Sequence, residues 1–193
     1  MVRTPVAPAP TLAIIGAGGL GRSIAYAAAV GGCRTILEDL LPNALRKAES
    51  EIRSHLDQAV NLGEISGETA EAVLGRLESA GSVEDAAREA DFIIEAVPDE
   101  LESKIEIFTL LDKICRPHTI LATTTADLSI AELASVTYRP GKCVGIRFVS
   151  PVHQMTHLEI TRALGTDDAT VAAAVDLGRR MGKVVSVIRE DPA

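Results

Sequence analysis

The sequence predicts an α/β fold in which a doubly wound, mostly parallel sheet carries helices on both faces. Short apolar runs alternate with helical stretches along the chain, and a glycine-rich turn joins the first run to the first helix. Alternating strands and helices favour parallel pairing, because each crossover helix returns the chain to the same edge of the sheet. With 193 residues, of which 47% are hydrophobic, the chain is large enough for one domain with a substantial core.

We expect this domain to span residues 11–190. Residues 1–10 contain three prolines and no long apolar stretch, which predicts a flexible leader rather than a signal peptide. Residues 191–193 are expected to form a short tail.

The first predicted unit is a strand at 11–15, a helix at 20–30 and a second strand at 35–37. Pro42 suits the first turn of a long helix that runs to about Asn61. Its apolar positions recur on one helical face. They are Leu45, Ala48, Ile52, Leu56 and Ala59.

The remaining predicted elements follow from short apolar runs, capping residues and stop signals. In chain order they are a helix at 69–74, a strand at 77–80, a helix after Ser82, a strand at 92–97, a helix at 101–114, strands at 119–123, 144–149 and 157–160, a helix at 169–181 and a strand at 184–188. Asp99 is expected to cap the helix at 101–114, and Thr166 the helix at 169–181.

The most informative motif is the G-x-G-x-x-G spacing of Gly16, Gly18 and Gly21, which lies between the strand at 11–15 and the helix at 20–30. In a Rossmann-type fold the first glycine permits the tight turn and the second lets a phosphate approach the backbone. The third lets the helix pack close to the sheet. The free N–H groups and the positive dipole end of the helix then face a diphosphate. This context predicts a dinucleotide site.

The acidic pair Glu38-Asp39 follows the second strand, at about the distance at which an acid meets the adenosine ribose hydroxyls. A carboxylate at Asp39 accepts hydrogen bonds from a 2′-hydroxyl and repels a 2′-phosphate. The next residues, 40–42, offer no basic replacement. The sequence therefore favours NAD over NADP, with FAD as a minor alternative because it uses a similar fingerprint.

Composition excludes several other classes. The net charge of −8 and the absence of a basic stripe argue against nucleic acid as a partner, and no apolar run is long enough to span a membrane. Cys33, Cys115 and Cys143 form no pair with metal-ligand or disulfide spacing, so we expect no metal site. A cytoplasmic protein is the expectation.

These segments resemble the N-terminal, NAD-binding domain of L-3-hydroxyacyl-CoA dehydrogenases over nearly the whole chain. The segments that carry the resemblance are 15–21, 90–98, 101–104, 118–122, 128–133 and 151–159. Several independent motifs in one order are more specific than the glycines alone. The family continues into an all-helical C-terminal domain that closes over the acyl group and forms the dimer, and that domain is absent from this sequence.

The resemblance implies further cofactor contacts. Asp99 matches an acidic cofactor contact and Lys104 a lysine near the nicotinamide ribose. Without the resemblance, Lys104 would be interpreted as a solvated charge beside Glu102. The expected cofactor-binding residues are Gly16, Gly18, Gly19, Leu20, Gly21, Asp39, Asp99, Lys104 and Ala126.

The reaction chemistry departs from the family, which oxidises a 3-hydroxyl by using a histidine oriented by a glutamate as the base. Glu159 matches the glutamate, but Arg147 occupies the histidine position. Arginine stays protonated and cannot accept the proton. Ala126 replaces a serine that contacts substrate and cofactor, while Thr124 and Ser150 each replace an asparagine.

Two hypotheses follow. The first is an NAD-dependent oxidoreductase acting on a hydroxyacyl thioester of CoA or a carrier protein, with Glu159, Arg147 and His157 as catalytic candidates and His153 as another candidate base. An Arg147–Glu159 pair is expected either to bind a substrate oxygen or to be a buried ion pair that preserves strand packing.

The second hypothesis is an NAD-binding module or partner subunit without a redox step. Under either hypothesis we expect a homodimer, structural roles for His55 and His118, and an inert Cys143.

Overall fold

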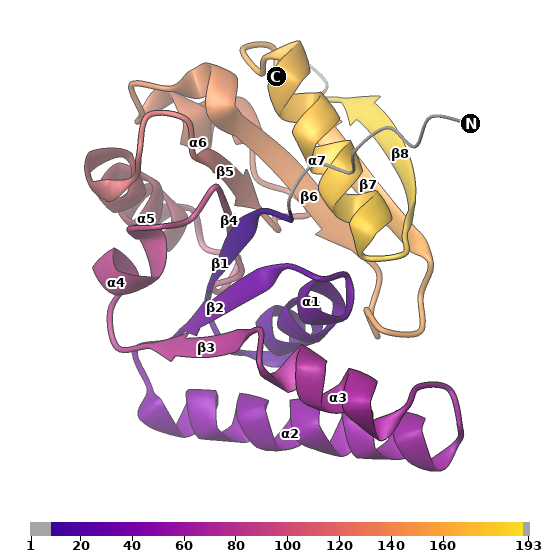
Figure 1. Ribbon diagram of the computed structural model, residues 1–193. Helices are drawn as coiled ribbons and strands as arrows, with labels where there is room; N and C mark the ends of the chain where they lie inside the picture. Colours follow the sequence, from indigo (N-terminus) through magenta and orange to yellow (C-terminus); the bar gives the residue numbers. More distant parts are fainter. Residues whose placement is uncertain (1–8, 191–193) are drawn as a thin grey trace.

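The computed structural model describes residues 9–190, so most of the expected leader and the whole of the expected tail at 191–193 lie outside the described residues. Within residues 9–190 the chain forms one eight-stranded sheet in the order β3-β2-β1-β4-β5-β6-β7-β8. The strands are β1 (Thr11–Ile15), β2 (Arg34–Glu38), β3 (Leu77–Ala80), β4 (Phe92–Glu95), β5 (Ile120–Thr123), β6 (Cys143–Phe148), β7 (His157–Arg162) and β8 (Val184–Arg189). In Figure 1 the N-terminal strands occupy one end of the sheet and the C-terminal strands the other.

All neighbouring strands pair in parallel except β6 and β7. These two are joined by the loop 149–156 without a crossover helix, and so they pair antiparallel. The doubly wound, mostly parallel sheet predicted from the sequence is confirmed.

Helices cover both faces of the sheet (Figure 1). They are α1 (Gly19–Val30), α2 (Pro42–Asn61), α3 (Gly67–Leu74), α4 (Val83–Ala87), α5 (Leu101–Ile114), α6 (Ile130–Ser135) and α7 (Asp168–Arg180), with a short 3-10 turn at Pro140–Lys142. One hydrophobic core lies under α1, α2, α3 and α7, and a second lies under α4, α5 and α6. Because both faces of the central strands are buried in these two cores, the sequences of these strands are continuous apolar runs.

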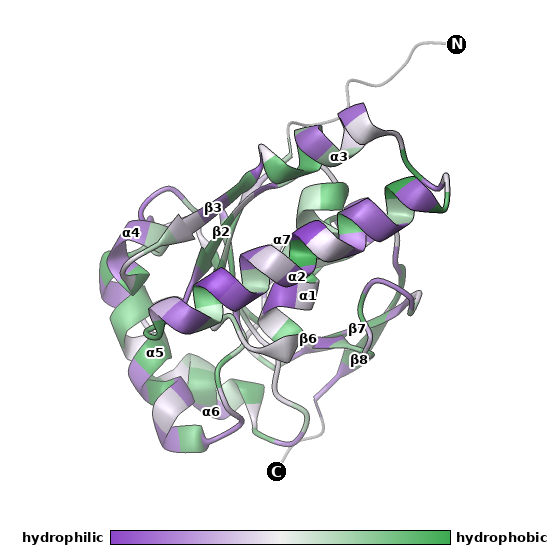
Figure 2. Cartoon of the chain, turned by 90° about the horizontal axis from the view of Figure 1, so that it is seen from below, coloured by the Kyte–Doolittle hydropathy of each residue, from purple (hydrophilic) through white to green (hydrophobic). Residues whose placement is uncertain are grey.

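The long helix α2 begins at Pro42, as predicted, and buries Ala48, Ile52, Leu56 and Ala59. Its remaining surface is largely hydrophilic, as Figure 2 shows along the helix that crosses the front of that view. Helix α2 packs on α1 and α3, so it extends the layer outside β1 and β2. In the part of the chain that the structure describes, no helix has the length and apolar character needed to cross a membrane.

The structure corrects two predicted caps and adds one helix. Asp167 is the N-cap of α7, while the Thr166 hydroxyl donates to the carbonyl of Cys143 at 2.7 Å. Glu100 is the N-cap of α5 and the Asp99 carboxylate is used elsewhere. Helix α6 was not predicted because it is short. Ser129 caps it, and the distant Glu190 carboxylate accepts the Ile130 amide at 2.6 Å.

Candidate functional site

The glycine-rich turn after β1 is held by contacts that allow no side chain at two positions. Gly16 has φ of +106°, and a Cβ built on it would lie 2.7 Å from the carbonyl oxygen of Ala96. A Cβ on Gly21 would lie 1.8 Å from the carbonyl oxygen of Gly16. The turn, the start of α1 and the loop after β4 therefore pack against one another through their backbones.

Gly18 and Gly19 differ from these two, because a Cβ on either would meet nothing within 4 Å. Gly18 is the N-cap of α1 and makes no side-chain cap hydrogen bond. The first amide groups of an α-helix have no partner within the helix and carry its positive dipole end. The residues present thus leave an open cradle of N–H groups that fits the pyrophosphate of a dinucleotide.

The Asp39 carboxylate lies at the side of this cradle. One oxygen accepts the amide of Ala17 at 2.8 Å, and the other accepts the amide of Leu41 at 2.8 Å. These two bonds fix the carboxylate between the glycine turn and the start of α2, where the sequence predicted an acid beside the ribose. Asp39 remains partly exposed.

Its neighbour Glu38 is buried, with 2% of its surface exposed, and its Oε1 has no hydrogen-bond partner among the described residues. Burial raises the pKa of the Glu38 carboxyl to about 7, and the charges of Asp39 and Glu84 add to this shift. A carboxyl group with such a pKa is partly neutral near neutral pH.

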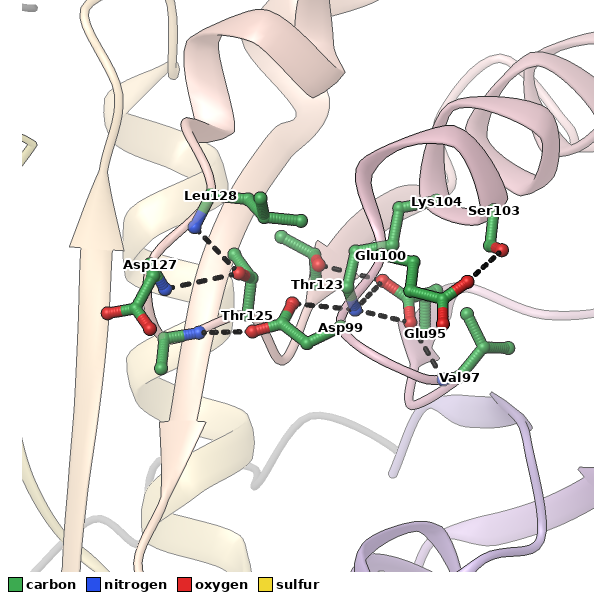
Figure 3. Close-up of polar contacts among 11 residues, drawn as sticks. Glu95, Val97, Asp99, Glu100, Ser103, Lys104, Thr123, Thr125, Asp127 and Leu128 are labelled. Atoms are coloured by element: carbon green, nitrogen blue, oxygen red, sulfur yellow. Dashed lines mark hydrogen bonds and ion pairs between the residues drawn. The ribbon is translucent and has the colours of Figure 1, made fainter.

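A second cluster joins the ends of β4 and β5 to α5 (Figure 3). Lys104 is fully buried, and its Nζ lies 2.8 Å from each carboxylate oxygen of Glu95. Glu95 also accepts the hydroxyl of Thr123 at 2.7 Å and the amide of Val97 at 2.8 Å. The buried ion pair is therefore fully hydrogen-bonded.

This geometry overturns the interpretation of Lys104 as a solvated charge beside Glu102. It also gives Lys104 a structural partner that the sequence analysis did not identify. The Lys104 ammonium extends toward Asp99, whose carboxylate oxygen lies 3.6 Å away. Lys104 thus pairs with Glu95 and also faces Asp99.

Asp99 links this cluster to the loop after β5, because its other oxygen accepts the amide of Ala126 at 3.3 Å (Figure 3). In the same loop the Thr125 hydroxyl accepts the amides of Asp127 at 3.3 Å and Leu128 at 2.9 Å. The structure thus brings Asp99 close to both Lys104 and Ala126.

The antiparallel pairing of β6 and β7 places Arg147 directly opposite Glu159. The Arg147 Nη2 lies 2.7 Å from a Glu159 carboxylate oxygen. The Arg147 side chain is 52% exposed and that of Glu159 is 17% exposed, so the pair is not the buried ion pair that we considered. The Arg147 guanidinium can therefore contact a ligand while its ion pair with Glu159 fixes its orientation.

His157 lies on the same face of β7 as Glu159, two residues earlier, as the alternation of a strand requires. Its Nε2 is 3.3 Å from the hydroxyl of Ser186 on the neighbouring strand β8. This contact can orient the imidazole on the face of the sheet that carries Arg147 and Glu159.

The other histidines lie apart from this face. His153 packs against His55 with ring centroids 4.7 Å apart, and both stand near Tyr26. Desolvation, with the nearby His55 and Lys183, lowers the pKa of His153. His118 lies 3.6 Å from Asp91 at the opposite end of the strands. Burial raises the pKa of the Cys143 thiol to about 11, which makes that thiol a poor nucleophile.

Sequence reasoning assigned no role to three residues of these clusters. They are Glu38, which it noted only as the neighbour of Asp39, and Glu95 and Thr123. Each is the last residue of a buried parallel strand, at the carboxyl edge where ligands bind in such sheets. A polar residue at the end of an apolar run was the signal in the sequence that could have identified each of them as a candidate site residue.

Comparison with known proteins assigns the chain. Residues 11–191 match the family described as 3-hydroxyacyl-CoA dehydrogenase, NAD binding domain. The chain is 34% identical to a probable 3-hydroxybutyryl-CoA dehydrogenase from Bacillus subtilis (strain 168), over 93% of this chain and 62% of that protein. It is also 34% identical to the 3-hydroxyadipyl-CoA dehydrogenase of Escherichia coli (strain K12), over 90% of this chain and 36% of that protein.

Among solved structures, the (S)-3-hydroxybutyryl-CoA dehydrogenase of Ralstonia eutropha superposes with a TM-score of 0.91 at 31% identity, covering 95% of this chain and 65% of that one. The chain thus spans less than two thirds of the length of these relatives. The open cradle of backbone amides, the acid at its side and the match over residues 11–191 agree. The chain belongs to the 3-hydroxyacyl-CoA dehydrogenase family, as an NAD-binding domain whose cofactor is NAD.

Proposed function

We propose that this chain supplies the redox half of an oxidoreductase that acts on a hydroxyacyl thioester, carried by CoA or by a carrier protein, with altered proton-transfer residues. The observation that supports the proposal is the Arg147–Glu159 pair, with 2.7 Å between Nη2 and the carboxylate oxygen. It occupies the place where the family resemblance puts a histidine and its orienting glutamate.

The Arg147 guanidinium holds its proton at all physiological pH values and cannot act as the base. Its planar set of N–H groups suits it to bind an oxygen atom instead. With Glu159 fixing one side of the guanidinium, the exposed N–H groups are free to donate to the carbonyl or developing alkoxide oxygen of the substrate. Arg147 would then orient the substrate and stabilise negative charge.

His157 is the proposed base. It lies on the face of the sheet that carries Glu159, and the Ser186 hydroxyl orients its ring. Two residues along a strand correspond to roughly 7 Å. A substrate hydroxyl held between the Arg147 and His157 side chains would therefore be within reach of both. His157 would take the hydroxyl proton, and NAD, when bound, would supply the acceptor for the hydride of the alcohol carbon.

The cofactor contacts are proposed as the sequence analysis expected them. The amides of residues 18–21 would hold the pyrophosphate, and Asp39 the adenosine ribose. Lys104, Asp99 and the loop at Ala126 would contact the nicotinamide ribose. A cytoplasmic homodimer remains an expectation.

The alternative is an NAD-binding module without a redox step. One observation favours it: Glu159 is engaged by a group that cannot accept a proton. Under this reading the pair holds β6 to β7 and the NAD-binding cradle serves as a sensor or as part of an assembly.

The test is NADH formation from NAD and each enantiomer of 3-hydroxybutyryl-CoA, together with carrier-bound analogues. We expect turnover that His157→Ala abolishes and that Arg147→Ala weakens mainly through a higher KM. NAD binding by calorimetry without turnover on any thioester would instead support the module. Turnover unaffected by His157→Ala would remove His157 from the proposal.

A further inference from the structure

Glu38 is a buried polar group that the proposed chemistry leaves unused. It is the last residue of β2, and only 2% of its surface is exposed. Its Oε1 has no hydrogen-bond partner among the described residues. A buried carboxyl oxygen without a partner lowers stability, so a protein that keeps one is expected to supply a partner from a ligand.

The position of Glu38 identifies which part of a ligand it would meet. Its carbonyl oxygen accepts the amide of Gly16 at 2.8 Å, so the residue lies beside the glycine turn. The Asp39 carboxylate, which is expected at the adenosine ribose, comes next in the chain. The ribose joins the pyrophosphate to the base, so a dinucleotide with its pyrophosphate at α1 and its ribose at Asp39 would carry its base beyond Asp39, on the side of the sheet where β2 ends.

Two exposed apolar side chains follow Glu38 closely in the chain and are suited to contact a flat aromatic base. Leu40 is 88% exposed and Leu41 is 66% exposed, although both are large apolar side chains. Exposed apolar residues beside an unpaired buried polar group are the usual composition of a ligand pocket. The apolar side chains would contact the face of the base, and the carboxyl group would contact its edge.

We propose that Glu38 recognises the adenine base of bound NAD. In its neutral form the carboxyl group offers one O–H donor and one C=O acceptor. Adenine offers the complement, because its amino group donates and the neighbouring ring nitrogen accepts. The orphaned oxygen of Glu38 would accept from the amino group, and the carboxyl proton would go to the ring nitrogen.

The charges around Glu38 favour this neutral form. Desolvation raises its pKa to about 7, with further contributions from Asp39 at the end of the same strand and Glu84 on α4. On the neighbouring strands the paired residues are Ile15 and Ala80, which carry no charge. A bound pyrophosphate adds negative charge and excludes water, and both effects raise the pKa further. NAD binding should therefore take up a proton, and the affinity should fall as the pH rises through 7.

The first experiment measures the NAD dissociation constant by calorimetry at about pH 6 and about pH 8.5, on either side of the Glu38 pKa. Wild type is expected to bind more weakly at the higher pH. Glu38→Gln, which presents a donor and an acceptor at every pH, should bind like wild type at the lower pH and lose the pH dependence. Glu38→Leu should bind about three- to tenfold more weakly at the lower pH. Glu71→Gln, an exposed charge on α3, is the matched control.

The second experiment replaces adenine by purine, using nicotinamide purine dinucleotide, which has a hydrogen atom where adenine has its amino group. Wild type should bind this analogue about three- to tenfold more weakly than NAD, and Glu38→Leu should bind the two about equally. The proposal fails if Glu38→Gln keeps the wild-type pH profile, or if Glu38→Leu still discriminates between the two bases. Thermal unfolding of each variant checks that the fold is intact.

Discussion

Lys104 and Glu95 form an ion pair inside the protein, with the ammonium nitrogen 2.8 Å from both carboxylate oxygens and both side chains at 1% exposure or less. The pair lies beside Asp99, whose carboxylate also accepts the amide of Ala126 (Figure 3). It joins α5 to β4, while Thr123 joins β5 to the same carboxylate. The loops at the proposed nicotinamide end therefore depend on this pair for their support.

We expect Lys104→Met to lower the free energy of unfolding by about 3–5 kcal/mol, because it leaves the Glu95 carboxylate buried without its cation. The double variant Lys104→Met, Glu95→Leu should regain much of that loss. Lys113→Met, on the exposed side of the same helix, should change the free energy by no more than about 0.5 kcal/mol. Urea denaturation followed by circular dichroism measures all three. A loss below about 1 kcal/mol for Lys104→Met would show that the pair is not a support.

Gly21→Ala tests the close approach of α1 to the glycine turn. A methyl group at this position would lie 1.8 Å from the carbonyl oxygen of Gly16, and a backbone atom cannot rotate away. We expect a loss of about 3 kcal/mol in the free energy of unfolding and weaker NAD binding. Gly67→Ala, at the start of α3, is the control, because nothing lies within 4 Å of a Cβ there. Equal effects of the two substitutions on NAD affinity would contradict the packing argument.

Arg147→His tests whether position 147 is the place of proton transfer. A histidine opposite Glu159 would restore a pair that can accept a proton and be oriented. With His157 as the base, turnover of a 3-hydroxyacyl thioester should not rise in this variant, and KM should rise because the guanidinium that binds the substrate oxygen is lost. Arg53→His on α2 controls for the change in charge. A rise in turnover of about tenfold or more, with a pH dependence centred near the histidine pKa of about 6.5, would instead place proton transfer at position 147 and contradict His157 as the base.

The stability of the protein without nucleotide should depend on pH through Glu38. Its pKa is raised from 4.5 to about 7 in the folded state, so the folded state binds more protons than the unfolded state between these values. The free energy of unfolding should therefore fall as the pH rises from about 4.5 toward 7 and stay lowered above it. This sign is opposite to that of a salt-bridged carboxylate.

Glu38→Gln removes this titration. The free energy of unfolding of the variant, relative to that of wild type, should therefore increase as the pH rises from about 4.5 to about 7. Urea denaturation at a series of pH values measures this difference in the free energy of unfolding, and Glu71→Gln is the reference for a solvated carboxylate. A constant difference between Glu38→Gln and wild type at all pH values would contradict the assigned pKa shift.

Much of the fold could be predicted because its signals are local. The apolar runs, Pro42 at the start of α2 and the glycines at 16, 18 and 21 each act within a few residues of the element they specify. The two caps that were wrong, at Asp99 and Thr166, failed because both side chains bond to distant backbone, at Ala126 and Cys143. Helix α6 was missed because it has only 6 residues, and part of its support is not local, since Glu190 accepts the Ile130 amide from 60 residues further along the chain.

The sequence by itself determined the family, the sheet with its helices and the cradle for NAD, since strand–turn–helix geometry follows from residue spacing. The tertiary structure alone decided that Lys104 is buried on Glu95 and that Arg147 faces Glu159 at a half-exposed surface. It also decided that Oε1 of Glu38 has no hydrogen-bond partner within residues 9–190. Burial and charge pairing depend on which segments meet in space. The identity of a charged residue in the sequence does not show whether water or another side chain surrounds it.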